Sequence, residues 1–330
     1  MKLFANSKQG TFCLACPRAC NLSRVKAYCG VRSAHGENVT CDVYGLVSSL
    51  AIDPVEKKPV FHYMPSSDVL SVGTLGCNMR CKGCQNWEIA HRDLDTYHWQ
   101  LKKIMPDALS DLALAHAQGV AWTYNEPTVW AEYVHDSAEL CKAKGLFTIV
   151  VTNGYYSVQT FALWEPVIDV FRIDIKGYSD STYDKFAPGV KASVVLENVE
   201  RAISHGKHVE VVTNVMPGIN DSDLPDIASF LVHLSPDIPW HITRFFPDFE
   251  LSELKPTPIK TLTDARAMAM DKGLHYVYVG NVDMAEVENT VCPSCGKLLI
   301  ERKGLLVTHN FIVNDRCPNC GQKIYGRFGG

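Results

Sequence analysis

The chain of 330 residues carries a net charge of −4, and its apolar (46%) and charged (21%) fractions are ordinary. This length and composition predict a globular protein with one large domain and smaller attachments. The slightly acidic balance argues against a nucleic-acid or membrane-surface role for the protein as a whole. The sequence shows neither an apolar signal segment at its start nor a run of about 20 apolar residues, so we expect a cytoplasmic protein that does not span a membrane.

The chain contains 13 cysteines, most of which gather in three tight groups. Because the cytosol keeps thiols reduced, such groups predict metal sites rather than disulfides. Cys141 lies on the apolar face of a helix-like stretch and Cys41 lies in a strand-like one, so both are expected in the core. The three groups are Cys13, Cys16, Cys20 and Cys29; Cys77, Cys81 and Cys84; and Cys292, Cys295, Cys317 and Cys320.

The N-terminal Cys-rich segment, residues 1–50, is the first of three domains that the sequence predicts. Its four cysteines supply four thiolates at irregular spacing, and zinc is the expected metal. An iron-sulfur cluster is the alternative, because cysteine ligands alone do not distinguish the two. His35 is a competing ligand, although a single histidine in a loop is more often solvated.

Residues 51–285 form the predicted core domain. Short β-branched runs alternate there with amphipathic stretches at helical spacing, which is the pattern of repeated strand-helix units around a parallel sheet. Such units make either a doubly wound sheet or a barrel, and periodicity does not separate the two. Gly119, Gly145 and Gly206 follow three of the helical stretches, where we expect helix C-caps.

The motif GCNMRCKGCQNW, Gly76 to Trp87, directly follows the first barrel-type strand. Its three thiolates can hold three irons of a [4Fe-4S] cluster in a wrapped loop and leave the fourth iron open. The amino and carboxylate groups of S-adenosylmethionine (SAM) suit an open iron, and SAM is a carrier of radical chemistry. The alternative is a zinc knuckle with a distant fourth ligand, but the position of the motif at a strand end favours the cluster.

Polar residues recur at the carboxyl ends of the later predicted strands, where α/β proteins gather their ligands. After the last of these strands, the proline-rich segment between Arg244 and Lys260 is expected to form a long ordered loop and part of a lid. The polar residues are Asn125 and Glu126, Thr152 and Asn153, Asp174 and Lys176, and His241 and Arg244.

Residues 286–330 form the third predicted domain, a C-terminal zinc ribbon. The knuckles CPSCG and CPNCG are separated by a strand-turn-strand pattern. Paired knuckles of this kind present thiolates from tight turns and complete a tetrahedral site. We therefore expect zinc bound by Cys292, Cys295, Cys317 and Cys320.

Eight stretches between about Ala51 and Asn281 together resemble the radical SAM enzymes. The closest resemblance is to the AmmeMemoRadiSam system radical SAM enzymes, which are related to pyruvate formate-lyase activating enzymes. The stretches are DPVEKKPVFHYMPSS, GCNMRCKGCQNWEIAH, WTYNEPTVWAEY, VTNGYYS, RIDIKGYSDSTYDKF, VMPGINDSD, PWHITRFFPD and YVYVGN.

The resemblance implies an α/β fold with a partial (β/α)6 TIM-like radical SAM barrel and a [4Fe-4S] cluster on Cys77, Cys81 and Cys84. It implies reductive cleavage of SAM to methionine and a 5′-deoxyadenosyl radical, which abstracts a hydrogen from the substrate. It also implies SAM contacts at the strand ends, although an ion pair or a helix start would explain some of these residues equally well. The implied contacts are Asn125 and Glu126 near the amino group, Thr152 and Asn153 in a TNG element, Asp174 and Lys176 near the carboxylate, and His241.

One residue departs from the pattern of the family. Gly83 occupies a position that is often aromatic and packs near the adenine. Another residue, such as Trp87, is therefore expected to provide this packing.

Two classes of function follow from the sequence. The first is a radical SAM oxidoreductase that acts on a protein, as glycyl-radical activating enzymes do, or on an RNA. The resemblance gives it an electron donor such as flavodoxin or ferredoxin, and AMMECR-type and Memo-type companion proteins. The second is a zinc-dependent RNA- or protein-binding module on a barrel scaffold. The polar strand ends favour the enzyme, because a scaffold does not need them.

Overall fold

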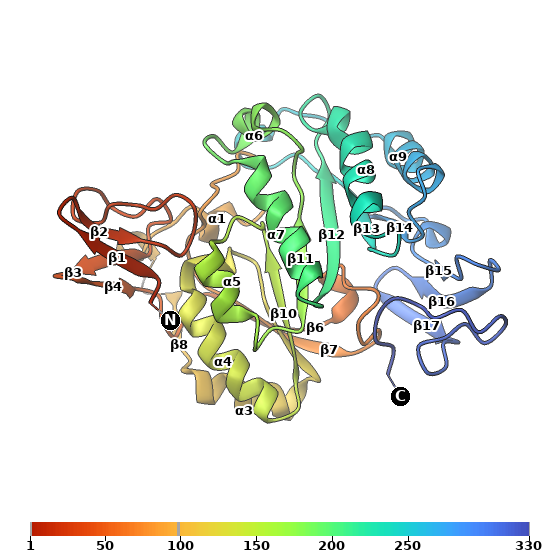
Figure 1. Ribbon diagram of the computed structural model, residues 1–330, viewed down its shortest axis with the longest axis horizontal. Helices are drawn as coiled ribbons and strands as arrows, with labels where there is room; N and C mark the ends of the chain where they lie inside the picture. Colours follow the sequence, from red (N-terminus) through yellow and green to blue (C-terminus); the bar gives the residue numbers. More distant parts are fainter. Residues whose placement is uncertain (1, 98–99, 330) are drawn as a thin grey trace. The chain divides into compact units, whose positions relative to one another are not determined.

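The structure is a computed structural model that describes residues 2–97 and 100–329 (Figure 1). The chain divides into two compact units. The first unit comprises the residues up to 53 together with 68–171, and the second comprises 54–67 and the residues from 172 onward. The three predicted domains follow sequence motifs rather than these units, and their boundaries stay a prediction. No helix in the described ranges is both long and apolar enough to cross a membrane.

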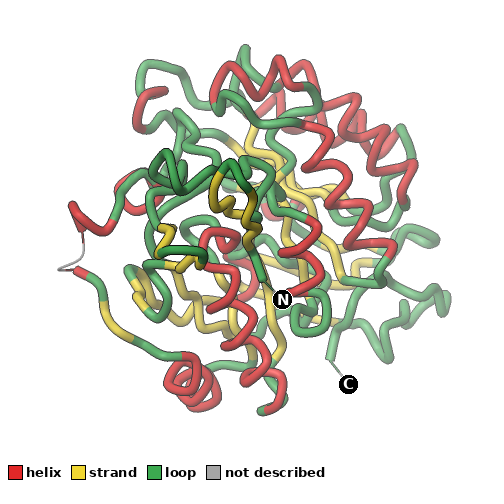
Figure 2. Tube along the Cα trace, turned by 60° about the vertical axis from the view of Figure 1, so that its left-hand side comes forward, coloured by secondary structure: helices red, strands yellow, loops and turns green. Residues whose placement is uncertain are grey.

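The N-terminal part of the first unit consists of short strands and turns, and its described residues, 2–53, contain no helix (Figure 2). β1 pairs antiparallel with β2, and β3 pairs antiparallel with β4. Cys13 at the end of β2 and Cys29 shortly before β3 are buried, so these hairpins turn cysteines inward. The strands are β1 (Phe4–Ser7), β2 (Gly10–Cys13), β3 (Arg32–His35), β4 (Asn38–Cys41), β5 (Leu46–Val47) and β6 (Ser49–Pro54).

The rest of the first unit is a parallel α/β arrangement. β9 lies between β7 and β10 and is parallel to both. Every residue of β9 and β10 is buried, as expected of parallel strands covered on both faces. The strands are β7 (Asp68–Gly73), β9 (Gly119–Trp122) and β10 (Phe147–Thr152), with the antiparallel β8 (Lys102–Lys103) on β5. The helices are α1 (Trp87–Ala90), α2 (Leu94–Tyr97), α3 (Pro106–His116), η3 (Pro127–Trp130), α4 (Ala131–Ala143) and α5 (Val158–Trp164).

The second unit repeats the strand-helix pattern in the strand order β14-β13-β12-β11. α8 buries Leu224, Ile227, Ala228 and Leu231, the face that its sequence predicts. The strands are β11 (Val170–Asp174), β12 (His208–Val215), β13 (Trp240–Arg244) and β14 (Val277–Gly280). The helices are η1 (Val55–Lys57), α6 (Asp180–Phe186), α7 (Ala192–Ser204), η4 (Asp221–Asp223), α8 (Leu224–Leu234), η5 (Phe249–Leu251), α9 (Ile259–Asp271) and η6 (Ala285–Val287).

Two of the three predicted glycine caps are confirmed. Gly145 follows α4 with a φ of +80° and Gly206 follows α7 with a φ of +70°, a conformation that glycine adopts without strain. The prediction for Gly119 is wrong, because α3 ends at His116 and Gly119 begins β9. A Cβ atom there would lie 2.5 Å from the ring of Phe147. The absence of a side chain at Gly119 therefore lets β9 and β10 lie next to each other with the ring of Phe147 against Gly119.

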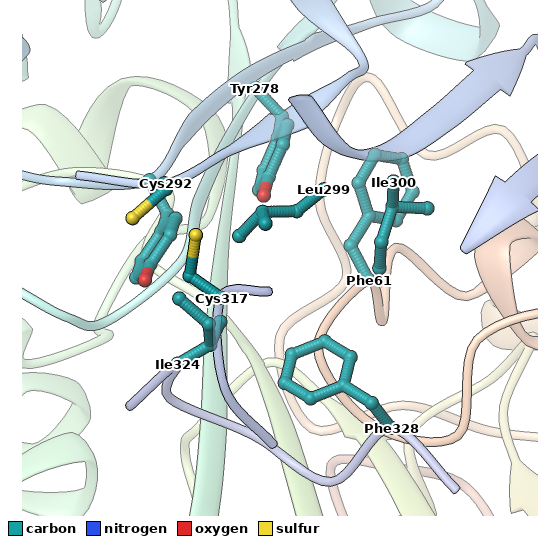
Figure 3. Close-up of a cluster of buried hydrophobic side chains, with 9 residues drawn as sticks. Phe61, Tyr278, Cys292, Leu299, Ile300, Cys317, Ile324 and Phe328 are labelled. Atoms are coloured by element: carbon teal, nitrogen blue, oxygen red, sulfur yellow. The ribbon is translucent and has the colours of Figure 1, made fainter. Parts of the chain in front are cut away.

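The C-terminal ribbon is a three-stranded antiparallel sheet of β15 (Thr290–Val291), β16 (Leu298–Lys303) and β17 (Leu306–Asn310). Its buried side chains pack against residues from the rest of the second unit, among them Phe61 and Tyr278 (Figure 3). The ribbon therefore shares a hydrophobic core with the second unit.

A buried polar network joins the ribbon to the strands of the second unit. The carboxylate of Glu210 accepts backbone N–H bonds from Phe61 (2.9 Å) and His62 (2.8 Å). It also bonds to the rings of His208 (3.0 Å) and His241 (2.7 Å). Burial raises the pKa of Glu210, but the bonds to the two histidines outweigh it and hold this pKa below its usual range. The network is therefore built around an ionised, fully partnered carboxylate.

His62 connects this network to the ribbon. Its ring nitrogens lie 2.6 Å from the hydroxyl of Tyr278 and 2.7 Å from the carbonyl oxygen of Tyr325. Burial lowers the pKa of His62 to about 3. The folded protein therefore holds this ring in its neutral form.

We expect the free energy of unfolding to fall as the pH is lowered from about 6.5. Below that value His62 becomes protonated in the unfolded chain, whereas in the folded protein it is protonated only near a pKa of about 3. The unfolded state therefore binds more protons, and lowering the pH stabilises it relative to the folded state. Replacing this residue, His62→Gln, should reduce the slope by up to about 1.4 kcal/mol per pH unit. The slope is measured by chemical denaturation at several pH values between about 3 and 6.5.

The control is His275→Gln, because the His275 side chain is 41% exposed and bonds only at the surface to Asp237. This variant should keep the slope of the unchanged protein. Equal slopes for the His62 and His275 variants would contradict the role given to the buried ring.

Candidate functional site

The three-cysteine loop leaves the carboxyl end of β7 and enters α1. Gly76 (φ +85°) and Arg80 (φ +53°) both have left-handed backbone conformations, which curl the loop. A Cβ atom on Gly76 would lie 2.7 Å from the carbonyl oxygen of Cys29. Glycine is therefore needed here, because the N-terminal segment packs directly on the loop.

The sulfur of Cys77 is buried and lies near the thiols of Cys81 and Cys84. Burial, and after it the nearby Cys81 thiol, raise the pKa of Cys77, and Cys84 adds to this shift. The backbone nitrogen of Met79 lies 3.4 Å from this sulfur, and the Asn153 amide nitrogen lies 3.7 Å from it. Neighbouring buried thiols need cations to ionise, and N–H bonds to sulfur are a feature of iron-sulfur sites. The donor set fits a cluster held by three cysteines.

Asn125 fixes the backbone that leads into Cys77. Its side-chain oxygen accepts the N–H of Thr74 at 3.0 Å. Its side-chain nitrogen donates to the carbonyl oxygens of Leu75 (3.2 Å) and Gly76 (3.1 Å). The predicted contact of Asn125 with SAM stays a prediction, and in the structure its amide positions the loop.

The carboxylate of Glu126 is buried and fully hydrogen-bonded. One oxygen accepts the N–H (3.0 Å) and hydroxyl (2.6 Å) of Thr128 and the hydroxyl of Thr152 (2.7 Å). The other oxygen accepts the N–H of Asn153 at 2.8 Å. Burial raises the pKa of Glu126, and the hydrogen bonds only partly oppose it. Glu126 thus caps η3 and ties the end of β9 to the end of β10.

Asn78 belongs to this site, although the sequence reasoning missed it. Its oxygen accepts from the Asn153 amide at 2.8 Å, and its nitrogen donates to the carbonyl of Tyr155 at 2.7 Å. Asn153 thereby connects Glu126 to the residue that follows Cys77. The available signal was a polar residue directly after the first cysteine of the motif.

Asp174 and Lys176 lie at the carboxyl end of β11, as the sequence predicted. Both residues belong to the second unit. The Lys176 ammonium is 2.9 Å from the Asp174 carboxylate, and Arg172 bonds to the other oxygen. Burial raises the pKa of Asp174, but the charges of Arg172 and Lys176 outweigh it and hold this pKa below its usual value. An ionised carboxylate at a strand end is compatible with the predicted SAM contact, which stays a prediction.

The predicted place of His241 at the carboxyl end of its strand is wrong. β13 runs from Trp240 to Arg244, so His241 is its second residue and only Arg244 marks the carboxyl end. The ring of His241 is buried, bonds to the carboxylate of Glu210 and stacks on the ring of Tyr278. The sequence did not show that the strand continues for three residues beyond His241. Its contact with SAM stays a prediction.

The predicted lid segment after Arg244 is a loop that contains the short helix η5 and runs up to Pro258, and α9 begins at the next residue. Its base is fixed by Thr257, whose carbonyl accepts from Arg244 at 2.9 Å and whose hydroxyl donates to the carbonyl of Val215 at 2.6 Å. Phe246 is 40% exposed. The loop is therefore anchored at both ends, and its closing role stays a prediction.

The four ribbon cysteines have the geometry of a zinc site. The sulfurs of Cys292 and Cys320 are 3.6 Å apart, those of Cys295 and Cys317 are 3.7 Å apart, and all four lie within 4.8 Å of one another. A tetrahedral zinc with Zn–S bonds of about 2.3 Å places its sulfurs about 3.8 Å apart. The thiols present therefore fit a tetrahedral metal such as zinc, and zinc itself stays a prediction.

The four N-terminal cysteines line one buried cavity of about 20 Å³. Burial raises the pKa of Cys16 to about 12 and that of Cys29 to about 11. His35 is exposed and bonds to Ser33 at the surface. The structure thus brings the thiols of this group together, and the metal that they bind stays a prediction.

Residues 71–231 match the Radical SAM superfamily. An uncharacterized protein of Methanocaldococcus jannaschii is 38% identical over 323 residues, which cover 94% of each chain. The pyruvate formate-lyase 1-activating enzyme of Escherichia coli is 28% identical over 157 residues, which cover 45% of this chain and 61% of that enzyme. A solved radical SAM methyltransferase from Sphaerobacter thermophilus is similar in fold, with a TM-score of 0.51, 13% identity, and coverage of 72% of this chain and 71% of that one.

These similarities point to one structural class, an α/β protein of parallel strands in a partial barrel with a three-cysteine loop at a strand end. The chain belongs to the radical SAM superfamily, a family of enzymes that use a [4Fe-4S] cluster and SAM. The fold class predicted from the sequence is confirmed.

Replacing Asn125, as Asn125→Ala, should loosen the three-cysteine loop. It leaves the N–H of Thr74 and two carbonyls without their partner, and each such buried group costs about 1–3 kcal/mol. We expect faster hydrogen exchange at the amides of residues 74–79 and a lower free energy of unfolding. The control is Asn6→Ala, because Asn6 makes its bond to Glu37 at the surface. The role of Asn125 would be refuted if both variants exchanged alike.

Proposed function

We propose that the protein cleaves SAM reductively at a [4Fe-4S] cluster held by Cys77, Cys81 and Cys84. The 5′-deoxyadenosyl radical released by this chemistry then takes a hydrogen from a protein or another macromolecule. The observation that carries the proposal is the buried Cys77 sulfur, close to two further thiols and to the nitrogens of Met79 and Asn153, at a strand end.

The residues of the chain have separate tasks in this proposal. Three thiolates bind three irons, and the fourth iron stays open for the amino and carboxylate groups of SAM. Asn125 and Glu126 hold the loop and the ends of β9 and β10 in position, which they do through hydrogen bonds that are already formed. The proposed contacts of SAM remain Asn125, Glu126, Thr152, Asn153, Asp174, Lys176 and His241. The electron comes from a one-electron donor such as flavodoxin or ferredoxin.

Two observations support a macromolecular substrate. The enzymes to which the chain is similar include the pyruvate formate-lyase 1-activating enzyme, whose name describes action on another protein. The β16–β17 hairpin of the ribbon carries apolar side chains in solvent, with Leu305 48% and Leu306 64% exposed, and we propose that they contribute to a binding surface. AMMECR-type and Memo-type proteins are the proposed companions, and an RNA is the alternative substrate.

Removal of the three thiols, as Cys77→Ala, Cys81→Ala and Cys84→Ala together, should abolish release of 5′-deoxyadenosine from SAM. The iron that cleaves SAM has no other ligands in this proposal. The measurement is made without oxygen, with dithionite as the reductant. The control Cys141→Ala removes a thiol outside the three cysteine groups and should keep the activity. Release of 5′-deoxyadenosine by the triple variant would refute the assignment.

The class of substrate can be identified from the hydrogen that the radical takes. The enzyme is incubated with fractions of deuterated cell lysate, and deuterium is followed into 5′-deoxyadenosine. We expect transfer from fractions of protein or RNA, because a reactive radical needs a partner that closes the site against solvent. Transfer confined to the fraction of small metabolites would show that the substrate is not a macromolecule.

A further inference from the structure

We propose that Cys13, Cys16, Cys20 and Cys29 hold a second iron-sulfur cluster rather than zinc, and that it passes an electron to the cluster of the three-cysteine loop. The first half of this proposal concerns the N-terminal cysteines alone. The second half, the relay, rests on the function proposed above.

The first observation is how far apart the sulfurs stand. In the described part of the chain, the ribbon thiols are the only set of three or more metal-type ligands whose atoms all lie within 4.8 Å of one another. The N-terminal thiols therefore stand farther apart than those of the ribbon. A single zinc draws its four sulfurs to about 3.8 Å, whereas in a [4Fe-4S] cluster each cysteine binds a different iron. The wider set suits the cluster.

The second observation is the cavity between these sulfurs. It has a volume of about 20 Å³ and is lined by all four cysteines, and it exceeds the roughly 10–15 Å³ that a water molecule needs. Apart from the thiols, its wall includes apolar side chains such as Ala15, Ala27 and Val129. A tetrathiolate zinc would leave no such space, because its sulfurs touch one another. The N-terminal sulfurs therefore do not close on one another as they would around a single zinc.

The third observation is a buried cation beside the thiols. Arg32 is only 3% exposed, and its guanidinium lies 4.0 Å from the sulfur of Cys13. The same guanidinium pairs with Glu132 and donates to the carbonyl of Val129 at 2.9 Å, so its position is fixed. Nearby charge and hydrogen bonds to sulfur set the reduction potential of a cluster. A fixed guanidinium favours the negative charge that a cluster gains on reduction.

The fourth observation is that the two cysteine groups share a wall. Asn78, the neighbour of Cys77, also lines the N-terminal cavity. Arg18 donates to the carbonyl of Asn78, and the hydroxyl of Tyr28 lies 3.4 Å from the carbonyl of Met79. The chain beside Cys29 touches Gly76, where a Cβ atom would lie 2.7 Å from the Cys29 carbonyl oxygen. An electron that passes from the N-terminal cysteines to the three-cysteine loop would cross only the residues of this shared wall.

The relay needs a donor from outside the chain. A reduced ferredoxin or flavodoxin loses one electron, and the N-terminal cluster gains it. This cluster then loses the same electron to the cluster of the three-cysteine loop and returns to its starting state. No bond is made or broken at the N-terminal cysteines, and no proton is needed there.

The metal is decided by analysis of the full chain purified without oxygen and carrying Cys77→Ala, Cys81→Ala and Cys84→Ala. We expect about two or four irons per chain with an equal amount of sulfide, since four cysteines hold either common cluster, and about one zinc in the ribbon. About two zinc ions and no iron would overturn the proposal. This result does not depend on whether the protein cleaves SAM.

If the triple variant does not fold, the double change Cys16→Ser and Cys20→Ser decides instead. Iron and sulfide should then fall by about two or four per chain from the amount in the unchanged protein. Unchanged iron together with a loss of about one zinc would overturn the proposal.

The relay is tested by comparing two reductants in this double variant and in the unchanged protein. Dithionite is small and can reach a cluster without a protein interface, so the rate with ferredoxin should fall at least about ten-fold further than the rate with dithionite. An unchanged ratio of the two rates would overturn the relay and leave the cluster assignment intact. Absence of SAM cleavage in the unchanged protein would overturn the proposed function and the relay with it, while the iron count would still decide the metal.

Discussion

The buried carboxylate of Glu126 is the interaction on which the site in the first unit depends. An ionisable group without water must find its partners within the chain, and those of Glu126 come from the end of β10 and from η3. One of these partners, Asn153, also bonds to Asn78 inside the three-cysteine loop. Glu126 thus helps to position the loop that carries the thiols, and Asn125 fixes the residues that lead into Cys77.

The sequence predicted the repeating architecture because hydrophobic periodicity depends on local residues alone. The strands β7 and β9 to β14 and the place of Asp174 at a strand end follow from it. It did not predict that His241 lies near the start of β13, because a buried polar residue in a strand has the same pattern as one at its end. Gly119 was misread for a related reason: glycine after a helix suggests a cap, but here the ring of Phe147 needs the space. Asn78 was missed because its partners are far away in sequence.

The two four-cysteine groups show what motifs leave undecided. In the sequence both supply four thiolates, and only the fold sets the separation of the sulfurs. The ribbon sulfurs stand 3.6 and 3.7 Å apart in their closest pairs, and the ribbon shares its core with the second unit. The N-terminal group instead surrounds a cavity and rests on the three-cysteine loop. In our proposals the same ligand type thus serves a structural zinc site in one place and a redox site in the other.

The most direct test of the proposed function is whether SAM binds an iron of the three-cysteine loop. The reduced protein is mixed with SAM that carries 15N in its amino group and 17O in its carboxylate, and electron-nuclear double resonance is recorded. We predict couplings of both nuclei that are strong enough for direct bonds to iron and that vanish when Cys77, Cys81 and Cys84 are replaced by alanine. A reduced cluster that shows neither coupling at saturating SAM would contradict the proposal.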